Sequence, residues 1–496
     1  MKKSFIANTM IVIISGFIIK ILGLLNRILI TRLLGPSGVS LYILSFPTIM
    51  LFISISGMSL NISTSKLVAE SLKLKNYSPR KIIFKSIILA LIVSTFTTCI
   101  FLIILKPLCY SFLKEPNLYY PLLTTVFLIP LVGISDTLKG YFNGLKEMGI
   151  SALSTVIEQI FRISFSIAAI FLLRPHGLIV TTVFILLSLS IGEIASIIFS
   201  IIKILKYRPP HYPKTKNEFN AICSISIPTT LTRLMGNFIY FLEPIVYTAV
   251  FTYLNYAQAD IANEYTIVNA YTIPLLTTVS FLSFAISTSV IPVMAENWAL
   301  KRTDAVHHYI SEALILSLIP GILIAVLFYY FPSEYMNLIY GTTLGSDQIR
   351  NLTFIFLFYY IHPPVVAILQ AIGKSKFIFA ISTISNVLKI ALIALLAFVP
   401  TIGLDSMLYA IIFSMILSTV ICLMTMLKVT NFSFNLRKVF NLVMLFLFTF
   451  GLTGVLNFLL KEKFLITSLI STICFIIICF KLNFFRFFKF QKRARV

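Results

Sequence analysis

Fourteen apolar runs, each long enough to cross a lipid bilayer as a helix, follow one another along this chain of 496 residues. A helix needs about 20 apolar residues to span the roughly 30 Å hydrocarbon core of a membrane. The repeated run length therefore predicts an all-α polytopic membrane protein with 14 transmembrane helices. The runs lie at about 5–26, 38–62, 82–104, 118–142, 151–173, 178–202, 220–249, 265–293, 308–330, 349–372, 377–398, 405–427, 439–459 and 464–480.

The composition excludes a soluble protein, because 58% of the residues are hydrophobic and only 11% are charged. The formal net charge of +23 would suggest nucleic acid in a soluble chain. Here most Lys and Arg residues fall in short connections between apolar runs, where they set membrane orientation and face anionic lipid. We therefore expect membrane lipids as partners and no nucleic acid.

The distribution of the basic residues predicts the orientation of the chain. With the N-terminus in the cytoplasm, 28 of the 40 Lys and Arg residues fall in cytoplasmic segments and 8 in outer ones. Lys139 and Lys146 are counted together in one cytoplasmic connection. This bias predicts a multi-pass protein of the cell membrane with both termini cytoplasmic. Lys2-Lys3 and the run after them resemble a signal peptide, but the length of the run favours a retained first span.

Lys20 lies well inside the first apolar run, and Arg27 and Arg32 lie near its far end. A turn, Gly35-Pro36-Ser37-Gly38, then separates the first run from the second. A cation at mid-bilayer costs at least about 2.5–3.5 kcal/mol, so such residues usually face a cavity or a partner. We expect Lys20, Arg27 and Arg233, which lies inside the seventh run, to face a water-filled cavity for an anionic substrate.

Other charged residues inside the runs have two interpretations, coupling of transport to an ion or structural pairing. Glu158 and Arg162 are four residues apart on one expected helix and can neutralise each other. The remaining members of this group are Glu193, Glu243 and Lys389.

No pattern in the sequence indicates a metal, a cofactor or an enzyme. The six cysteines are scattered without a CxxC spacing, which favours packing roles. Gly373-Lys374-Ser375 lacks the first glycine of a P-loop. A membrane glycosyltransferase would need a constellation of carboxylates, usually in a large loop, and no loop is long enough to hold one.

The two halves of the chain resemble each other with an offset of about 226 residues. Pro47 and Pro274 each open a run that contains Ser-Thr-Ser and closes with Ala-Glu. ALSTVIEQIFR and AISTISNVLK place Arg162 and Lys389 at matching positions. Six spans per repeat would insert both halves with the same orientation, which is a secondary-transporter architecture.

The repeat predicts four parts, two six-helix bundles around a central cavity and two extra C-terminal helices. These parts are an N-terminal lobe at 1–205, a cytoplasmic linker at 206–219, a C-terminal lobe at 220–428, and two helices with a basic tail at 429–496.

Three stretches resemble a known superfamily: NRILITRLLGPSGVSLYILSFP with SKLVAE, KGYFNGLKEMGISALSTVIEQIFR, and the run that ends in STSVIPVMAE. They are similar to the multidrug/oligosaccharidyl-lipid/polysaccharide (MOP) exporter superfamily. Within it they resemble the polysaccharide biosynthesis branch that contains stage V sporulation protein B and the Gram-positive lipid II flippases. Lys20 matches one arginine of the basic pattern of such flippases. Asn26 stands where a second arginine would be, and Arg27 stands where an acid would be.

The resemblance implies a flippase that moves undecaprenyl-diphosphate-linked saccharide, such as a peptidoglycan precursor or polysaccharide unit, across the cytoplasmic membrane. Alternating access would carry the substrate, and the role would lie in spore cortex or cell-wall synthesis. We expect a monomer. The alternative is a multidrug or cation antiporter of the same superfamily, which would bind its substrate through buried acids.

Overall fold

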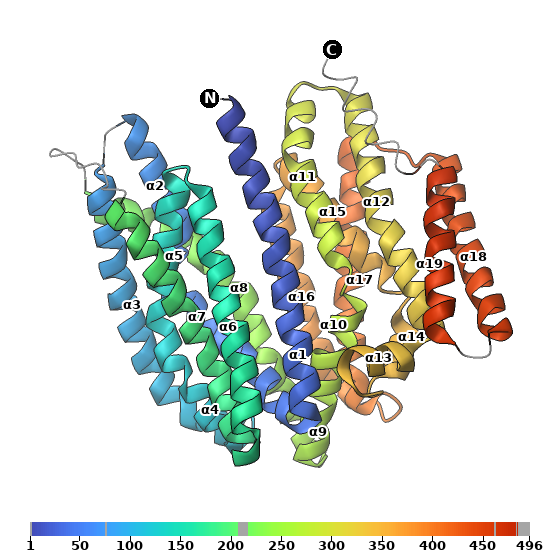
Figure 1. Ribbon diagram of the computed structural model, residues 1–496, viewed down its shortest axis with the longest axis horizontal. Helices are drawn as coiled ribbons and strands as arrows, with labels where there is room; N and C mark the ends of the chain where they lie inside the picture. The colour runs from blue at the N-terminus through green and yellow to red at the C-terminus, as the bar shows by residue number, and fades with distance from the viewer. Residues whose placement is uncertain (1, 75–76, 207–216, 461–462, 483, 485–496) are drawn as a thin grey trace. The chain divides into compact units, whose positions relative to one another are not determined.

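The computed structural model describes residues 2–74, 77–206, 217–460, 463–482 and 484 (Figure 1). Every element described in these ranges is helical, which confirms the predicted all-α class. Most of the predicted linker at 206–219 and most of the basic C-terminal tail lie outside the described residues.

The helices cluster into two compact units. The first unit is Met1–Thr266 with Ile393–Leu404, and the second is Ile267–Leu392 with Asp405–Val496. The long helices of the first unit are α1 (Lys2–Gly57), α2 (Leu60–Leu74), α3 (Pro79–Pro107), α5 (Thr125–Gly144), α6 (Met148–Leu173), α7 (Leu178–Lys206) and α8 (Glu218–Tyr253), with the shorter α4 (Tyr119–Leu123) and α9 (Gln258–Thr266). A π-helical turn, Leu108–Phe112, follows α3.

The second unit contains the long helices that follow α9. They are α11 (Ser280–Ala299), α12 (Thr303–Tyr330), α15 (Leu357–Ala371), α16 (Ser375–Ala397), α17 (Ser406–Thr430), α18 (Leu436–Leu459) and α19 (Phe464–Lys481), with the shorter α10 (Ile273–Leu276), α13 (Pro332–Tyr340) and α14 (Ser346–Leu352). The last residues of α16 are counted with the first unit.

The described helices are compatible with the 14 predicted spans. Eleven of the described helices are long and apolar enough to cross a membrane, and the number is up to 13 if each of two bent pairs of helices counts as one span. The bent pairs are Gln258–Leu276 with Ser280–Ala299, and Ser346–Leu352 with Leu357–Ala371. One of the eleven, Ser15–Leu72, has 58 residues, nearly three times the about 20 that one crossing needs, so it is long enough for two spans.

The predicted turn at Gly35–Gly38 is a single break inside α1. Gly35 has φ 73° and ψ 172°, and helical backbone continues on both sides of it. Only glycine adopts such a φ readily, so one residue suffices to separate the first two spans. A second break, at Met58 and Ser59, separates α1 from α2, and both residues have positive φ, 43° and 48°.

Helix starts recur between the two halves of the chain, as the sequence repeat predicts. The starts of α3 and α12 are 224 residues apart, those of α6 and α16 are 227 apart, and those of α7 and α17 are 228 apart. The units that contacts define nevertheless differ from the predicted lobes. α8, which opens the second repeat, packs on α1, α2 and α3 of the first unit. The lobe boundaries themselves remain a prediction from the repeat.

Glycines allow α5 to lie directly against α2. A Cβ atom at Gly140 would approach the Asn61 carbonyl oxygen to 2.5 Å, and one at Gly144 would approach the Ser65 carbonyl oxygen to 2.7 Å. Small residues four apart let membrane helices pack backbone to backbone. This close contact fixes the position of α5 along α2. Part of the site described below lies on α5.

The C-terminal helices α18 and α19 pack on each other and on α12. Aromatic rings form much of this contact. The centroid of the Tyr329 ring lies 5.1 Å from that of Phe354 and 5.3 Å from that of Phe450, and Phe354 lies 5.5 Å from Phe446. Such ring pairs add about 0.5–1.5 kcal/mol each beyond the area they bury.

Candidate functional site

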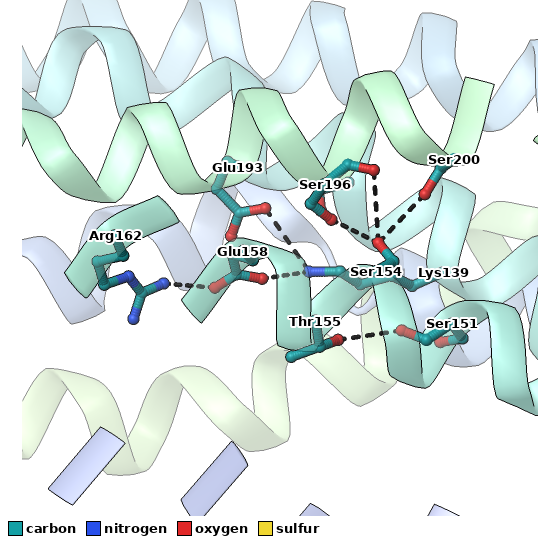
Figure 2. Close-up of polar contacts among 10 residues, drawn as sticks. Lys139, Ser151, Ser154, Thr155, Glu158, Arg162, Glu193, Ser196 and Ser200 are labelled. Atoms are coloured by element: carbon teal, nitrogen blue, oxygen red, sulfur yellow. Dashed lines mark hydrogen bonds and ion pairs between the residues drawn. The ribbon is translucent and has the colours of Figure 1, made fainter. Parts of the chain in front are cut away.

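A buried lysine joins three helices of the first unit. Lys139 on α5 places its ammonium 2.7 Å from Glu158 Oε2 on α6 and 3.6 Å from Glu193 Oε2 on α7. The exposed fractions of the three residues are 8%, 5% and 8%. Figure 2 shows the ammonium between the two carboxylates. A buried charge is tolerated where partners of opposite sign surround it, so these helices hold one another in register.

Arg162 completes a charge network of four residues. Its guanidinium donates a hydrogen bond to Glu158 Oε1, one turn away on the same helix (Figure 2). Each oxygen of the Glu158 carboxylate therefore accepts from a different cation. We call Lys139, Glu158, Arg162 and Glu193 the charge network. Its two positive and two negative side chains balance.

Small residues allow α6 and α7 to approach closely beside this network. A Cβ atom at Gly192 would lie 2.8 Å from the Glu158 carbonyl oxygen. One turn away, the Ser154 hydroxyl lies 2.6 Å from the Ser196 hydroxyl and 3.2 Å from that of Ser200 (Figure 2). The carboxylates of Glu158 and Glu193 can face the same ammonium because no bulky side chain separates the two helices.

A second polar group lies where α8 meets α1 and α2. The Arg233 guanidinium is 3.5 Å from the Ser59 hydroxyl, and the Asn237 amide donates to the Ser54 hydroxyl. Asp136, one turn before Lys139 on α5, interacts electrostatically with both Lys139 and Arg233. Arg233 itself is exposed. Asp136 therefore links Arg233 electrostatically to the charge network.

The structure brings together only some of the predicted site residues. Glu158, Arg162 and Glu193 meet in the charge network, and the predicted Glu158–Arg162 pair is present. Lys20 is exposed and Arg27 is half-buried, both on α1 and outside that network. Glu243 is buried on α8, and Lys389 is half-buried on α16, in the second unit.

The assignment of Lys139 to a cytoplasmic connection is wrong. Lys139 belongs to α5 and is the shared partner of both buried glutamates. The sequence does offer one signal, since Lys139 falls within the apolar run at 118–142. The carboxylates that stabilise it lie on two other helices, so the sequence around Lys139 does not indicate them. Among the described residues, no three His, Cys, Asp or Glu side chains converge to hold a metal ion.

Comparison with a solved structure shows the class of protein to which this chain belongs. The chain is similar in fold to a solved structure described as "Lipid II flippase MurJ, inward closed conformation", with a TM-score of 0.65 and 18% identity over 94% of this chain and 97% of that one. At 18% identity, this structural similarity shows that the two proteins share a fold and nothing further. Together with the apolar helices, the family matches and the relatives given next, it makes the chain a multi-pass membrane protein of the MOP superfamily.

The chain belongs to the family described as "Polysaccharide biosynthesis protein", which matches residues 5–298. The family described as MatE, also of this superfamily, matches residues 241–395. The chain is 30% identical to stage V sporulation protein B of Bacillus subtilis, over 88% of this chain and 86% of that protein. It is 21% identical to the lipid II flippase MurJ of the same organism, over 79% of this chain and 77% of that protein.

Proposed function

We propose that this protein is a flippase that moves a saccharide linked to undecaprenyl diphosphate across the cytoplasmic membrane. The relative that is named a lipid II flippase supports the substrate class, and the sporulation protein supports a role in spore cortex or cell-wall synthesis. The protein acts as a monomeric transporter and not as an enzyme, with both termini in the cytoplasm. Two lobes, 1–205 and 220–428, alternate access to the site between inside and outside.

The state of the buried charges is the observation that carries this proposal. Glu158 and Glu193 are both engaged with Lys139, so they do not offer a free carboxylate to a cationic drug. Lys20 and Arg233 are exposed on membrane-spanning helices. A cation that faces lipid is costly, so these side chains favour a water-filled path that accepts an anion. A diphosphate suits them because charged hydrogen bonds to phosphate are strong.

The residues named for substrate contact are Lys20, Arg27 and Arg233. The charge network holds α5, α6 and α7 together, whereas Glu243 and Lys389 keep two roles, structural pairing and coupling. A multidrug antiporter remains the second candidate because the MatE match covers part of the chain, including Glu243.

The test measures the leaflet orientation of a fluorescent undecaprenyl-diphosphate sugar in proteoliposomes. The wild-type protein equilibrates the lipid between leaflets, and Lys20→Ala and Arg233→Ala lose this activity at normal protein level. Leu25→Ala, at an exposed apolar position on α1, is the matched control and stays active. If the protein leaves the labelled lipid in its original leaflet but extrudes a cationic dye, the flippase proposal is refuted and the antiporter takes its place.

A further inference from the structure

Helix α8 belongs to one half of the chain by sequence and to the other by contact. The internal repeat makes it the first span of the second half, whereas its contacts in the structure are with α1, α2 and α3. If the two halves move against each other during transport, these contacts have to break and re-form. The chemistry of the contact therefore bears on whether it can open.

Three side-chain hydrogen bonds run along the contact between α8 and the α1–α2 region. The Asn237 amide donates to the Ser54 hydroxyl, Arg233 lies 3.5 Å from the Ser59 hydroxyl, and the Ser226 hydroxyl donates to that of Ser63 over 2.7 Å. Residue numbers fall on α8 as they rise on the other side, so the pairs form one antiparallel row. We call the six residues of these three pairs the polar seam.

The polar seam is built differently from the contacts on its two sides. α2 meets α5 through Gly140 and Gly144 with backbone against backbone, which leaves no room for sliding. α5 is in turn tied to α6 and α7 by the charge network. The seam is held by hydroxyl, amide and guanidinium groups instead, and water can replace such partners when a contact opens. Two other contacts of α8 have to part with it: the 2.8 Å ion pair of Glu218 with Lys85 on α3, and the packing of Ile222 in the hydrophobic core with Leu60. A line that opens this region and leaves the charge network intact runs between α2 and α8.

The middle of the polar seam coincides with the break between α1 and α2. Ser59 has a φ of 48°, in the left-handed region that residues other than glycine rarely adopt. Its neighbour Met58 is in the same region. Backbone of this kind persists where the surrounding structure holds it and clusters at switch regions. Here Ser59 is buried, and the residue that contacts it across the seam is the exposed Arg233.

We propose that the polar seam is a gate that parts during transport and that Arg233 couples its opening to the substrate. The hydrogen bond of Arg233 to Ser59 is long, so an anionic diphosphate competes for the guanidinium against that bond and the attraction of Asp136. Drawing Arg233 away removes the central link of the seam and leaves its two neutral pairs, together with the Lys85–Glu218 ion pair, to separate. This inference rests on the proposed flippase function and adds the element that opens.

A reversible cross-link tests the gate. In a chain with its six native cysteines replaced by serine, Ser63→Cys and Ser226→Cys place two thiols where the hydroxyls are 2.7 Å apart, within reach of a disulfide. The matched control is Ser166→Cys with Ser188→Cys, whose hydroxyls are also 2.7 Å apart but join α6 to α7 within one predicted lobe. We expect oxidation to abolish flipping in the first pair and not in the control, and reductant to restore it.

The outcomes separate the gate from the function itself. If the oxidised Ser63–Ser226 pair flips lipid as fast as its reduced form, the seam does not part and the gate is refuted, while the flippase function stands. If the wild-type protein moves no lipid-linked diphosphate, the proposed function fails instead.

A second measurement reads the coupling without transport. We expect disulfide formation in the Ser63–Ser226 pair to slow when undecaprenyl diphosphate is added in detergent, and Arg233→Gln to remove this effect. An unchanged rate in a protein that flips the lipid would refute the role of Arg233.

Discussion

Replacing Glu158 by glutamine tests whether the charge network is structural. The carboxylate accepts from Lys139 at one oxygen and from Arg162 at the other. The substitution keeps the shape of the side chain and removes its charge. Lys139 still has Glu193 at 3.6 Å, whereas Arg162 loses the carboxylate that it pairs with, and its buried Nε already lacks a hydrogen-bond partner.

The expected loss in the free energy of unfolding depends on which cation is left without its carboxylate. Leaving a buried charge uncompensated costs about 3–5 kcal/mol. Glu193→Gln costs less, roughly 1 kcal/mol on the scale of one hydrogen bond, because its pair with Lys139 is longer and Lys139 keeps Glu158. At roughly 2 °C per kcal/mol for a unit of this size, we expect the melting temperature to fall by about 6–10 °C in Glu158→Gln. Glu193→Gln should lower it by about 2 °C.

Buried thiols provide the assay. Cys109 is fully buried in the same unit as the charge network. In a chain whose other five cysteines are replaced by serine, a dye that fluoresces on reaction with thiols therefore reports unfolding of this unit. Adding Arg162→Met to Glu158→Gln removes the stranded cation and should recover part of the loss. If Glu158→Gln melts no lower than Glu193→Gln, or if Arg162→Met adds to the damage, the reasoning about the network is wrong.

Three further substitution experiments test the orientation, the packing and the cavity cation. In intact cells, an impermeant thiol reagent should label Asp260→Cys and not Lys374→Cys, both of which are exposed in the structure; the opposite labelling would invert the predicted topology. Gly140→Ala should lower the melting temperature because its Cβ meets backbone of α2, whereas Gly236→Ala, with nothing within 4 Å, should leave it unchanged or higher; equal effects would contradict the packing. Lys20→Arg should keep more flipping activity than Lys20→Ala because the positive charge persists. If both variants lose the same activity, a positive charge at this position is not sufficient for flipping.

The fold could be predicted from the sequence because the membrane requires long apolar helices wherever the chain crosses. Gly35 marks the break between the first two spans in both the sequence and the structure. The repeat also recurs in the helix starts. Hydrophobic periodicity could not predict which helices α8 packs against. Its contacts with α1 and α2 depend on hydroxyl and amide groups that look ordinary in a sequence.

The site was less predictable for a physical reason. A charged pair on one helix, such as Glu158 and Arg162, is visible as a four-residue spacing. Lys139 is stabilised by residues on two other helices, and a lone lysine near the end of an apolar run is indistinguishable from a lysine in a loop. Its partners become apparent only when Gly192 lets α7 pack closely against α6 and so brings Glu158 and Glu193 to the same ammonium.

The attachment of α18 and α19 to α12 has a consequence for the synthesis of the protein. These two helices leave the ribosome long after α12, so the aromatic face around Tyr329 and Phe354 is made before Phe446 and Phe450 exist to cover it. In water such a face would invite aggregation until its cover arrived. In a bilayer the acyl chains solvate it at no hydrophobic cost. The last hairpin of this chain therefore docks by displacing lipid from a surface that was stable without it.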